Sequence, residues 1–300
     1  MKKIVLSMVA ALALFSAPAF AADMPAKAPA APAPAPNPTF DILFGGVVQS
    51  DYNFRGVSQS NRGPSGGAYV EPDFITPVGT FYVGVAGWAI DWPSGPGYGF
   101  TSPSAEIDLY GGWRNTWGPF SLDLGGIYYY YPKESFNGFT SQSDFWEIYG
   151  KASYEVVKGL TFGGTVFYTP DLLHYSTTFA TLGVSNHPDG IYASLTGKWI
   201  LPWTAGDVGA YISGELGHWW IEDTGFLAVG LLDPSYTFWS AGIALTYKAL
   251  TLDFRYYGND LSVAGCGSFL LTGVPNNSNN WCDDTFIVAL KFDTSTNALK

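Results

Sequence analysis

The sequence predicts an all-β chain that closes into a transmembrane antiparallel up-and-down β-barrel of about twelve strands. Hydrophobic and polar residues alternate over stretches of about ten residues, and short turns alternate with long loops between those stretches. Charged residues make up only 13% of the chain and aromatic residues 17%, so a large apolar exterior is expected. A soluble β-sandwich is the alternative, in which the apolar faces would form the interior.

Composition and charge exclude two other classes. Beyond the N-terminus the sequence has no run of about 20 apolar residues, so helical membrane spans are excluded. The formal net charge of −11 and a pI near 4.5 argue against nucleic acid as a partner.

Residues 1–21 have the pattern of a bacterial signal peptide. Lys2 and Lys3 precede a short apolar segment, and Ala19-Phe20-Ala21 supplies a small-x-small cleavage site. Cleavage there removes two lysines and no acid, so the net charge goes from −11 to −13. The expected destination is the bacterial outer membrane, with outer-membrane lipid as a partner.

The following residues, 22–38, form a linker rich in proline and alanine. Such a segment favours extended polyproline II at about 3.1 Å per residue. It is interpreted as a periplasmic spacer, and contact with the cell wall or a periplasmic partner is the alternative. The barrel is expected over 39–292, and a C-terminal tail over 293–300.

Twelve alternating stretches define the expected strands. They cover 39–55, 67–76, 81–92, 104–114, 119–131, 144–156, 160–169, 190–199, 208–219, 237–247, 250–257 and 285–292. Aromatic residues gather at strand ends, where Tyr and Trp favour membrane interfaces: Phe40, Tyr52, Phe54, Trp113, Tyr128, Tyr130, Trp199 and Trp219.

The connections set the orientation. Short turns are expected at 77–79, 115–118, 157–159, 201–207 and 248–249, and the other connections are long and rich in Gly, Pro, Ser and Asn. In outer-membrane barrels the short turns face the periplasm and the long loops face the exterior.

Several segments resemble a known family. SDYNFRGVSQS (Ser50–Ser60), AEIDLYGGW (Ala105–Trp113), DLGGIYYYYP (Asp123–Pro132) and WSAGIALTYKALTLDFRYYGNDLS (Trp239–Ser262) are similar to the TorF family of porins. The resemblance covers the chain after the linker and implies an outer-membrane barrel that acts as a channel. It transfers no catalytic or binding residue. Barrels of this kind usually end on an aromatic residue, whereas here eight residues follow Phe292.

The polar faces of the strands supply the pore-lining candidates. The expected acids are Asp41, Asp51, Glu71, Asp73, Glu106, Asp108, Asp123, Glu147, Glu155, Glu215 and Asp253. The expected bases are Arg55, Arg114, Lys151, Lys198, Arg255 and Lys291. Eleven acids against six bases give a lumen charge of −5, which favours cations in a narrow water-filled pore. A paired network that fills the lumen is the alternative.

Asp51 and Arg55 share one face of the first expected strand. Four residues on a strand place them about 13 Å apart, so each needs partners on neighbouring strands. Structural pairing and a role at a constriction are both open.

Cys266 and Cys282 are expected to form a disulfide in an exported loop, closing a ring of 17 residues. Metal ligation is not expected because no further soft ligands lie nearby in sequence, and no cofactor is expected.

Three function classes follow. The leading one is a narrow, cation-leaning channel for passive diffusion of small hydrophilic solutes or ions. The second is a structural or surface-interaction barrel with a plugged lumen. An enzyme is not expected: His174, His187 and His218 are the only histidines, and Ser185-Asn186-His187 lacks a spacing that aims these groups at each other. The Gly-rich segment Gly95–Gly99 lacks the strand-to-helix context of a phosphate site.

Overall fold

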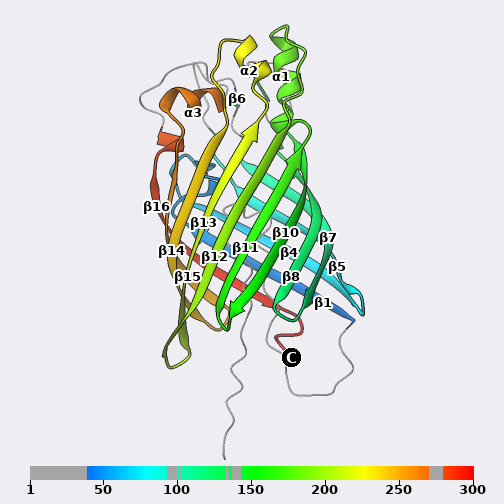
Figure 1. Cartoon of the computed structure of the whole chain (residues 1–300), viewed down its shortest axis with the longest axis vertical. Helices are drawn as coiled ribbons and strands as arrows, with labels where there is room; N and C mark the ends of the chain where they lie inside the picture. The colour runs from blue at the N-terminus through cyan, green and yellow to red at the C-terminus, as the bar shows by residue number, and fades with distance from the viewer. Residues whose placement is uncertain (1–38, 93–99, 102, 133–134, 137–142, 270–279) are drawn as a thin grey trace, which may run out of the picture.

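Twelve antiparallel strands close into a β-barrel in the computed structural model (Figure 1). The structure describes residues 39–92, 100–101, 103–132, 135–136, 143–269 and 280–300. The expected signal peptide, linker and Gly95–Gly99 segment lie outside the described residues. The barrel strands are β1 (Phe40–Gln49), β4 (Ser65–Thr76), β5 (Gly79–Ala89), β7 (Ala105–Trp117), β8 (Phe120–Tyr130), β10 (Phe145–Val157), β11 (Leu160–Thr169), β12 (Gly190–Ala205), β13 (Val208–Ile221), β14 (Tyr236–Tyr247), β15 (Leu250–Asn259) and β16 (Thr285–Ser295).

Each barrel strand pairs with its neighbours along the chain, and β1 pairs with β16 to complete the ring. This is the up-and-down topology that the sequence predicts, and closure rules out the open edges of a sandwich. All twelve expected strands are present, with ends displaced by up to six residues.

Five two-residue turns join strands at one end of the barrel, at 77–78, 118–119, 158–159, 206–207 and 248–249. A residue with positive φ occurs in or beside each turn, as tight hairpins require, and four of these five residues are glycines. The expected connection over 201–207 is wrong in extent: β12 continues to Ala205 through an irregularity between Ile200 and Thr204. The pairing of β12 with β13 resumes after Pro202, because the bulge accommodates the residues that do not pair.

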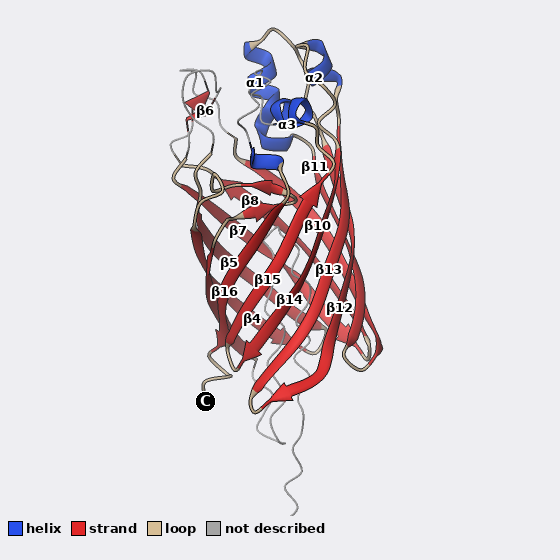
Figure 2. Cartoon of the chain, turned by 90° about the vertical axis from the view of Figure 1, so that its left-hand side faces the viewer, coloured by secondary structure: helices blue, strands red, loops and turns tan. Residues whose placement is uncertain are grey.

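Short helices collect at the opposite end, together with the long connections (Figure 2). They are η2 (Leu172–His174), α1 (Tyr175–Thr181), α2 (Thr224–Ala228), α3 (Val263–Phe269) and η3 (Asn280–Cys282). Two small strand pairs lie outside the barrel ladder: β2 (Asn53–Phe54) with β3 (Val57–Ser58), and β6 (Phe100–Thr101) with β9 (Ser135–Phe136). Among the described residues, no helix combines the length and apolar character needed to cross a membrane.

The outer surface carries a band of exposed aliphatic side chains between two belts of aromatic ones. Leu195 in β12 is 71% exposed, and Val48, Val83, Ile148 and Leu216 share its outward orientation. Phe74, Trp117, Phe162 and Trp199 flank the band near the turns, and Trp146, Trp220 and Phe286 flank it near the loops. A band of this kind is matched to lipid hydrocarbon and its interfaces.

The chain end is fastened to the start of β1. Asp41 accepts hydrogen bonds from the Thr296 hydroxyl at 2.7 Å and from the Asn297 backbone N–H at 2.9 Å. Strand β16 runs to Ser295, three residues beyond Phe292. The hydrogen bonds to Asp41 hold the turn after β16 against β1, where the first and last strands close the barrel.

Candidate functional site

A hairpin folded into the barrel dominates the lumen. Strands β2 and β3 pair Asn53 with Ser58 and Phe54 with Val57, which leaves Arg55 and Gly56 as a two-residue turn. Both have positive φ, at 47° and 89°, as a type I′ turn demands. Glycine adopts this conformation freely, whereas Arg55 does so at a cost of about 1 to 2 kcal/mol. An arginine held in such a conformation at a hairpin tip points to a constraint beyond local folding.

This hairpin corrects the sequence interpretation of the first strand. The expected strand ran to Arg55 and turned Tyr52 and Phe54 toward lipid, but β1 ends at Gln49 and both aromatic side chains are buried inside the barrel. Trp219, also expected at a lipid interface, is buried inside as well. The period of two is the same in a membrane strand and in an inward hairpin, so alternation alone does not separate them.

Arg55 reaches across the lumen to the far wall. Its guanidinium donates to both carboxylate oxygens of Glu147 on β10, at 2.9 and 2.8 Å. Its Cζ also lies 4.2 to 4.8 Å from four ring centroids, those of Phe54, Phe167, Tyr192 and Trp219. Strand β11, which carries Phe167, is six steps from β1 in either direction around the ring, so it lies opposite β1.

The charge state of this buried arginine follows from its partner. Burial acts to lower the pKa of Arg55, but the Glu147 carboxylate together with Tyr129 and Tyr192 outweighs that effect and holds the pKa above its ordinary value. Arg55 and Glu147 both have fully buried side chains. A bidentate pair in this setting fixes the hairpin tip because separating the two charges leaves each without compensation.

Further contacts secure the base of the hairpin. Asp51 accepts from the hydroxyls of Ser58 at 2.6 Å and Ser60 at 2.9 Å, and pairs with Arg62 at 3.1 Å. Asp51 and Arg55 thus bind different partners, but they do not share a strand face as expected, because β1 ends at Gln49 and Arg55 lies in the hairpin turn. Asn259 at the end of β15 donates to the backbone oxygens of Gly56 and Cys282, each at 2.7 Å.

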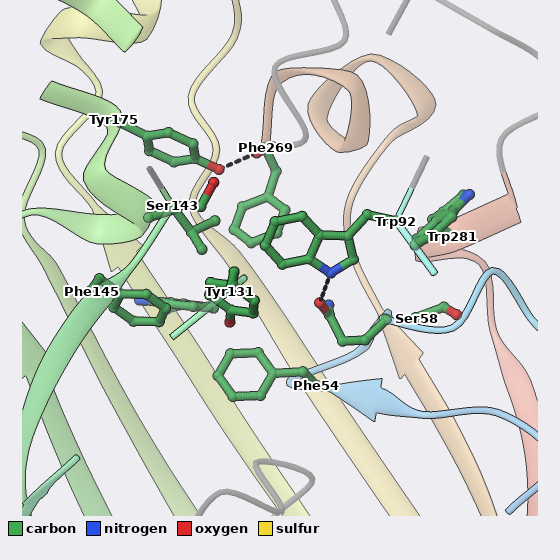
Figure 3. Close-up of a pocket in the computed structure, with 12 residues that line it drawn as sticks. Phe54, Ser58, Trp92, Tyr131, Ser143, Phe145, Tyr175, Phe269 and Trp281 are labelled. Atoms are coloured by element: carbon green, nitrogen blue, oxygen red, sulfur yellow. Dashed lines mark hydrogen bonds between the residues drawn. The ribbon is translucent and has the colours of Figure 1, made fainter. Parts of the chain in front are cut away.

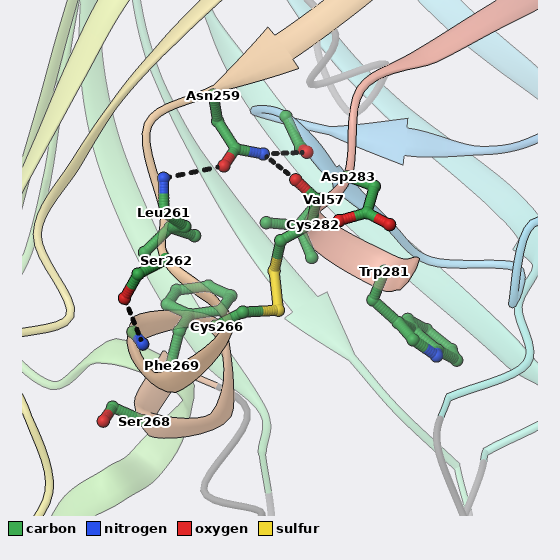
Figure 4. Close-up of a disulfide and its surroundings, with 12 residues drawn as sticks. Val57, Asn259, Leu261, Ser262, Cys266, Ser268, Phe269, Trp281, Cys282 and Asp283 are labelled. Atoms are coloured by element: carbon green, nitrogen blue, oxygen red, sulfur yellow. Dashed lines mark hydrogen bonds between the residues drawn. A yellow bond between two sulfur atoms is a disulfide. The ribbon is translucent and has the colours of Figure 1, made fainter. Parts of the chain in front are cut away.

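The contact between Asn259 and Cys282 connects the hairpin region to a disulfide. Cys266 in α3 and Cys282 in η3 are joined, with their Cα atoms 6.1 Å apart, which confirms the predicted pair (Figure 4). Arg62 donates to the backbone oxygens of Trp281 and Asp283 beside it. The disulfide loop and the hairpin therefore support each other.

The other predicted charges form separate groups on the inner wall. Arg114 pairs with Glu71 at 2.7 Å and with Asp73 at 2.5 Å. Arg255 and Lys291 both approach Asp253, at 3.2 and 3.6 Å. Together with the ion pairs of the hairpin, these groups make the lumen partly a paired network.

Other inner carboxylates bind aromatic donors. Tyr52 and Tyr131 donate to the two oxygens of Glu106 at 2.6 and 2.7 Å. Trp88 donates to Asp108 at 2.8 Å, and Tyr192 donates to Glu215 at 2.6 Å. Asp123 accepts from Tyr82 at 2.5 Å.

Two of the bases lie against aromatic rings. Lys151 Nζ is 4.6 Å from the Tyr149 ring centroid and Lys198 Nζ is 3.9 Å from that of Tyr211. Asp41 and Glu155, in contrast, form hydrogen bonds at the turn end of the barrel. Glu155 accepts from the Gly159 backbone N–H at 2.7 Å. Sequence reasoning missed the inward roles of Tyr52, Phe54 and Trp219. The Arg55-Gly56 pair was the available signal for a hairpin turn.

An aromatic pocket lies above the hairpin at the loop end. Its enclosed part measures about 40 Å³, and eight of its twelve lining residues are aromatic (Figure 3). The Phe54 side chain of the hairpin forms part of its floor, while Trp92, Tyr131 and Trp281 come from three different loops. None of the lining residues carries a charged side chain.

The three histidines lie toward the loop end of the barrel. His174 and His187 each lie 3.9 Å from Asp171 at the surface, and His218 contacts the Thr237 hydroxyl at 2.9 Å. In the described part of the chain, no three His, Cys, Asp or Glu side chains gather in a way that could hold a metal ion.

Comparisons with solved structures return outer-membrane barrels. The chain is 11% identical to the NanC porin, with a TM-score of 0.46 over 84% of this chain and 98% of that one. It is 11% identical to the outer-membrane channel DcaP of Acinetobacter baumannii, with a TM-score of 0.38 over 85% and 96%. It is 10% identical to LpxR from Salmonella typhimurium, with a TM-score of 0.40 over 84% and 99%. Likenesses this distant say nothing about what the barrel transports or binds.

The family comparison covers most of the chain. No curated protein matches it. Residues 35–291 match the Gcw_chp family, described as bacterial proteins of unknown function. Since this match spans the barrel almost from end to end, the chain belongs to the Gcw_chp family.

Proposed function

We propose that this protein is a porin-like channel of the bacterial outer membrane, exported by its N-terminal signal peptide, that allows passive diffusion of small hydrophilic solutes or ions. The observation that carries the proposal is a closed barrel with an aliphatic exterior and a charged interior. Such a barrel satisfies its backbone polar groups within lipid and leaves a polar interior for solutes. The resemblance to TorF porins agrees with this function.

The channel is narrow, and the hairpin sets its narrowest point. Inner side chains near the hairpin, such as Glu147 and Tyr129, are almost fully buried. Inner side chains toward the turns, such as Arg114, Tyr211 and Lys291, are only partly buried, so water reaches that half of the lumen. The hairpin, residues 53–58, therefore acts as the constriction, with Arg55 pinned to Glu147 across it.

A preference for cations follows from the inner charges. Nine predicted acids are buried: Asp51, Glu71, Asp73, Glu106, Asp108, Asp123, Glu147, Glu215 and Asp253. The inner bases, with Arg62 included, number seven: Arg55, Arg62, Arg114, Lys151, Lys198, Arg255 and Lys291. An excess of acids along a restricted path favours cations over anions.

Planar-bilayer recording in a KCl gradient tests the proposal. We expect a small conductance with a reversal potential on the cation side. Replacing residues 53–58 by two glycines is expected to raise the conductance several-fold, whereas Asp207→Asn at an exposed turn is expected to leave it unchanged. An anion-side reversal potential would contradict the cation preference.

A barrel with a permanently plugged lumen is the second candidate, and the Arg55–Glu147 contact favours it because the hairpin crosses the lumen. Its function would then lie in surface interaction through the long loops. Conductance that appears only after removal of residues 53–58 would establish this alternative. Absence of conductance in both proteins would exclude a channel.

A further inference from the structure

The aromatic pocket above the hairpin is separate from the charged inner wall. Its walls come from the hairpin, from loops between barrel strands and from the end of β13. Trp92 and Tyr131 form one side, with ring centroids 4.5 Å apart, and Phe54 and Trp219 form another, with centroids 5.9 Å apart. Figure 3 shows the rings of Phe54, Trp92 and Tyr131 around a common space. The enclosed part of the pocket measures about 40 Å³, and the pocket is open on one side.

The polar groups of the pocket are largely occupied by the protein itself. The Trp92 indole N–H donates to Gln59 Oε1 at 2.8 Å, and the Ser58 hydroxyl donates to Asp51 at 2.6 Å. The Tyr131 hydroxyl donates to Glu106 at 2.7 Å. The pocket therefore presents ring faces more than hydrogen-bonding groups. A sugar or an anion, each of which depends on donors and acceptors, matches it poorly.

The electrostatic surroundings favour positive charge. Carboxylates stand directly behind the lining: Glu106 behind Tyr131, Asp51 behind Ser58, and Asp144, which accepts from the Tyr131 backbone N–H at 2.7 Å. The two nearby arginines are both paired, Arg55 with Glu147 and Arg62 with Asp51. The faces of aromatic rings carry negative potential of their own.

The same molecule shows how such rings hold a cation. Phe54 and Trp219, which line the pocket, also have ring centroids within 4.8 Å of the Arg55 guanidinium. Aromatic rings that enclose a positive group with apolar surface bind it without hydrogen bonds, as in recognition of quaternary ammonium groups.

We propose that the pocket binds a small organic cation with an apolar surface, of the quaternary ammonium class. This inference goes beyond the channel function and does not depend on conduction, because binding is measured on the purified barrel. It accounts for a lining that combines eight aromatic side chains with no charged one and with carboxylates behind it.

Calorimetric titration of the full-length protein in detergent tests the proposal with choline as the probe. The matched neutral compound is 3,3-dimethyl-1-butanol, which has the same shape with carbon in place of the charged nitrogen. We expect choline to bind saturably and at least about tenfold more tightly than the alcohol. Equal affinity for the two would overturn the assignment to cations, and absence of choline binding would overturn the site.

Variants locate the binding. Trp92→Leu is expected to weaken choline binding at least about tenfold, and Trp92→Phe, which keeps a ring, is expected to recover most of it. Trp203→Leu, at an exposed position near a turn, is the control and should bind choline as the natural protein does. Equal binding by Trp92→Leu and Trp203→Leu would contradict the proposed location. A heat-modifiability shift on gel electrophoresis verifies that each variant is folded.

Discussion

Arg55 and Glu147 are 92 positions apart in sequence and form a bidentate ion pair across the lumen. Arg55 stands at the tip of a hairpin that follows β1, and Glu147 stands on β10, on the other side of the barrel. Their side chains are fully buried. This one contact holds the segment that narrows or closes the lumen, so both candidate functions depend on it.

Glu147→Gln is expected to destabilise the barrel by about 3 to 5 kcal/mol, because the buried charge of Arg55 loses its partner. The urea midpoint in detergent micelles measures the effect. Glu155→Gln on the same strand is the matched control, since its side chain serves only the turn at Gly159. The double variant Arg55→Met/Glu147→Leu is expected to recover most of the loss. Equal midpoints for the two single variants would show that the pair contributes little.

Gly67→Ala is expected to cost about 1 to 3 kcal/mol through overpacking. A Cβ at Gly67 would lie 1.9 Å from the indole ring of Trp88, its cross-strand partner, and would push that ring away from Asp108. The unfolding free energy and the near-UV circular dichroism of the buried tryptophan report the change. Gly87→Ala, whose Cβ would meet nothing closer than 3.9 Å, should behave as the natural protein.

Leu195→Arg is expected to reduce folding into lipid vesicles, at a cost of about 2 to 4 kcal/mol, because it places a charge on the lipid-facing band. Leu195 is 71% exposed on β12. Leu182→Arg, in the connection after α1 and 52% exposed, supplies the same change outside the barrel strands and is expected to fold normally. A similar folding yield for both variants would mean that the band does not face lipid.

Reduction of the Cys266–Cys282 disulfide is expected to add two hydrogens in mass and to expose the loop around it to protease. The bond closes a loop with a sequence separation of 16, worth about 3 kcal/mol in chain entropy, and that loop is where its effect is concentrated. The double variant Cys266→Ser/Cys282→Ser should keep its heat-modifiable migration. Loss of that migration would show that the disulfide supports the whole barrel.

Much of the barrel was predictable because lipid imposes a strong pattern. Leu250, Leu252, Phe254 and Tyr256 alternate with Thr251, Asp253 and Arg255, and the structure places Asp253 and Arg255 inside and Tyr256 outside. Charged residues on strands were assigned to the inner face for the same reason, since a lipid-facing charge is costly. The outcome differed at Tyr52, Phe54 and Trp219, where apolar character was taken to mean lipid contact but the side chains pack inside.

The sequence by itself determined the number of strands, the lipid-facing side of strands such as 250–257 and the pairing of its two cysteines. These depend on local periodicity and on composition, which are legible in a linear chain. Only the tertiary structure decided where the chain leaves the barrel wall, that Arg55 meets Glu147, and that eight aromatic side chains from distant segments line one pocket. Such contacts join residues far apart in sequence. The barrel must close and bring β10 opposite β1 before Arg55 of the hairpin can reach Glu147.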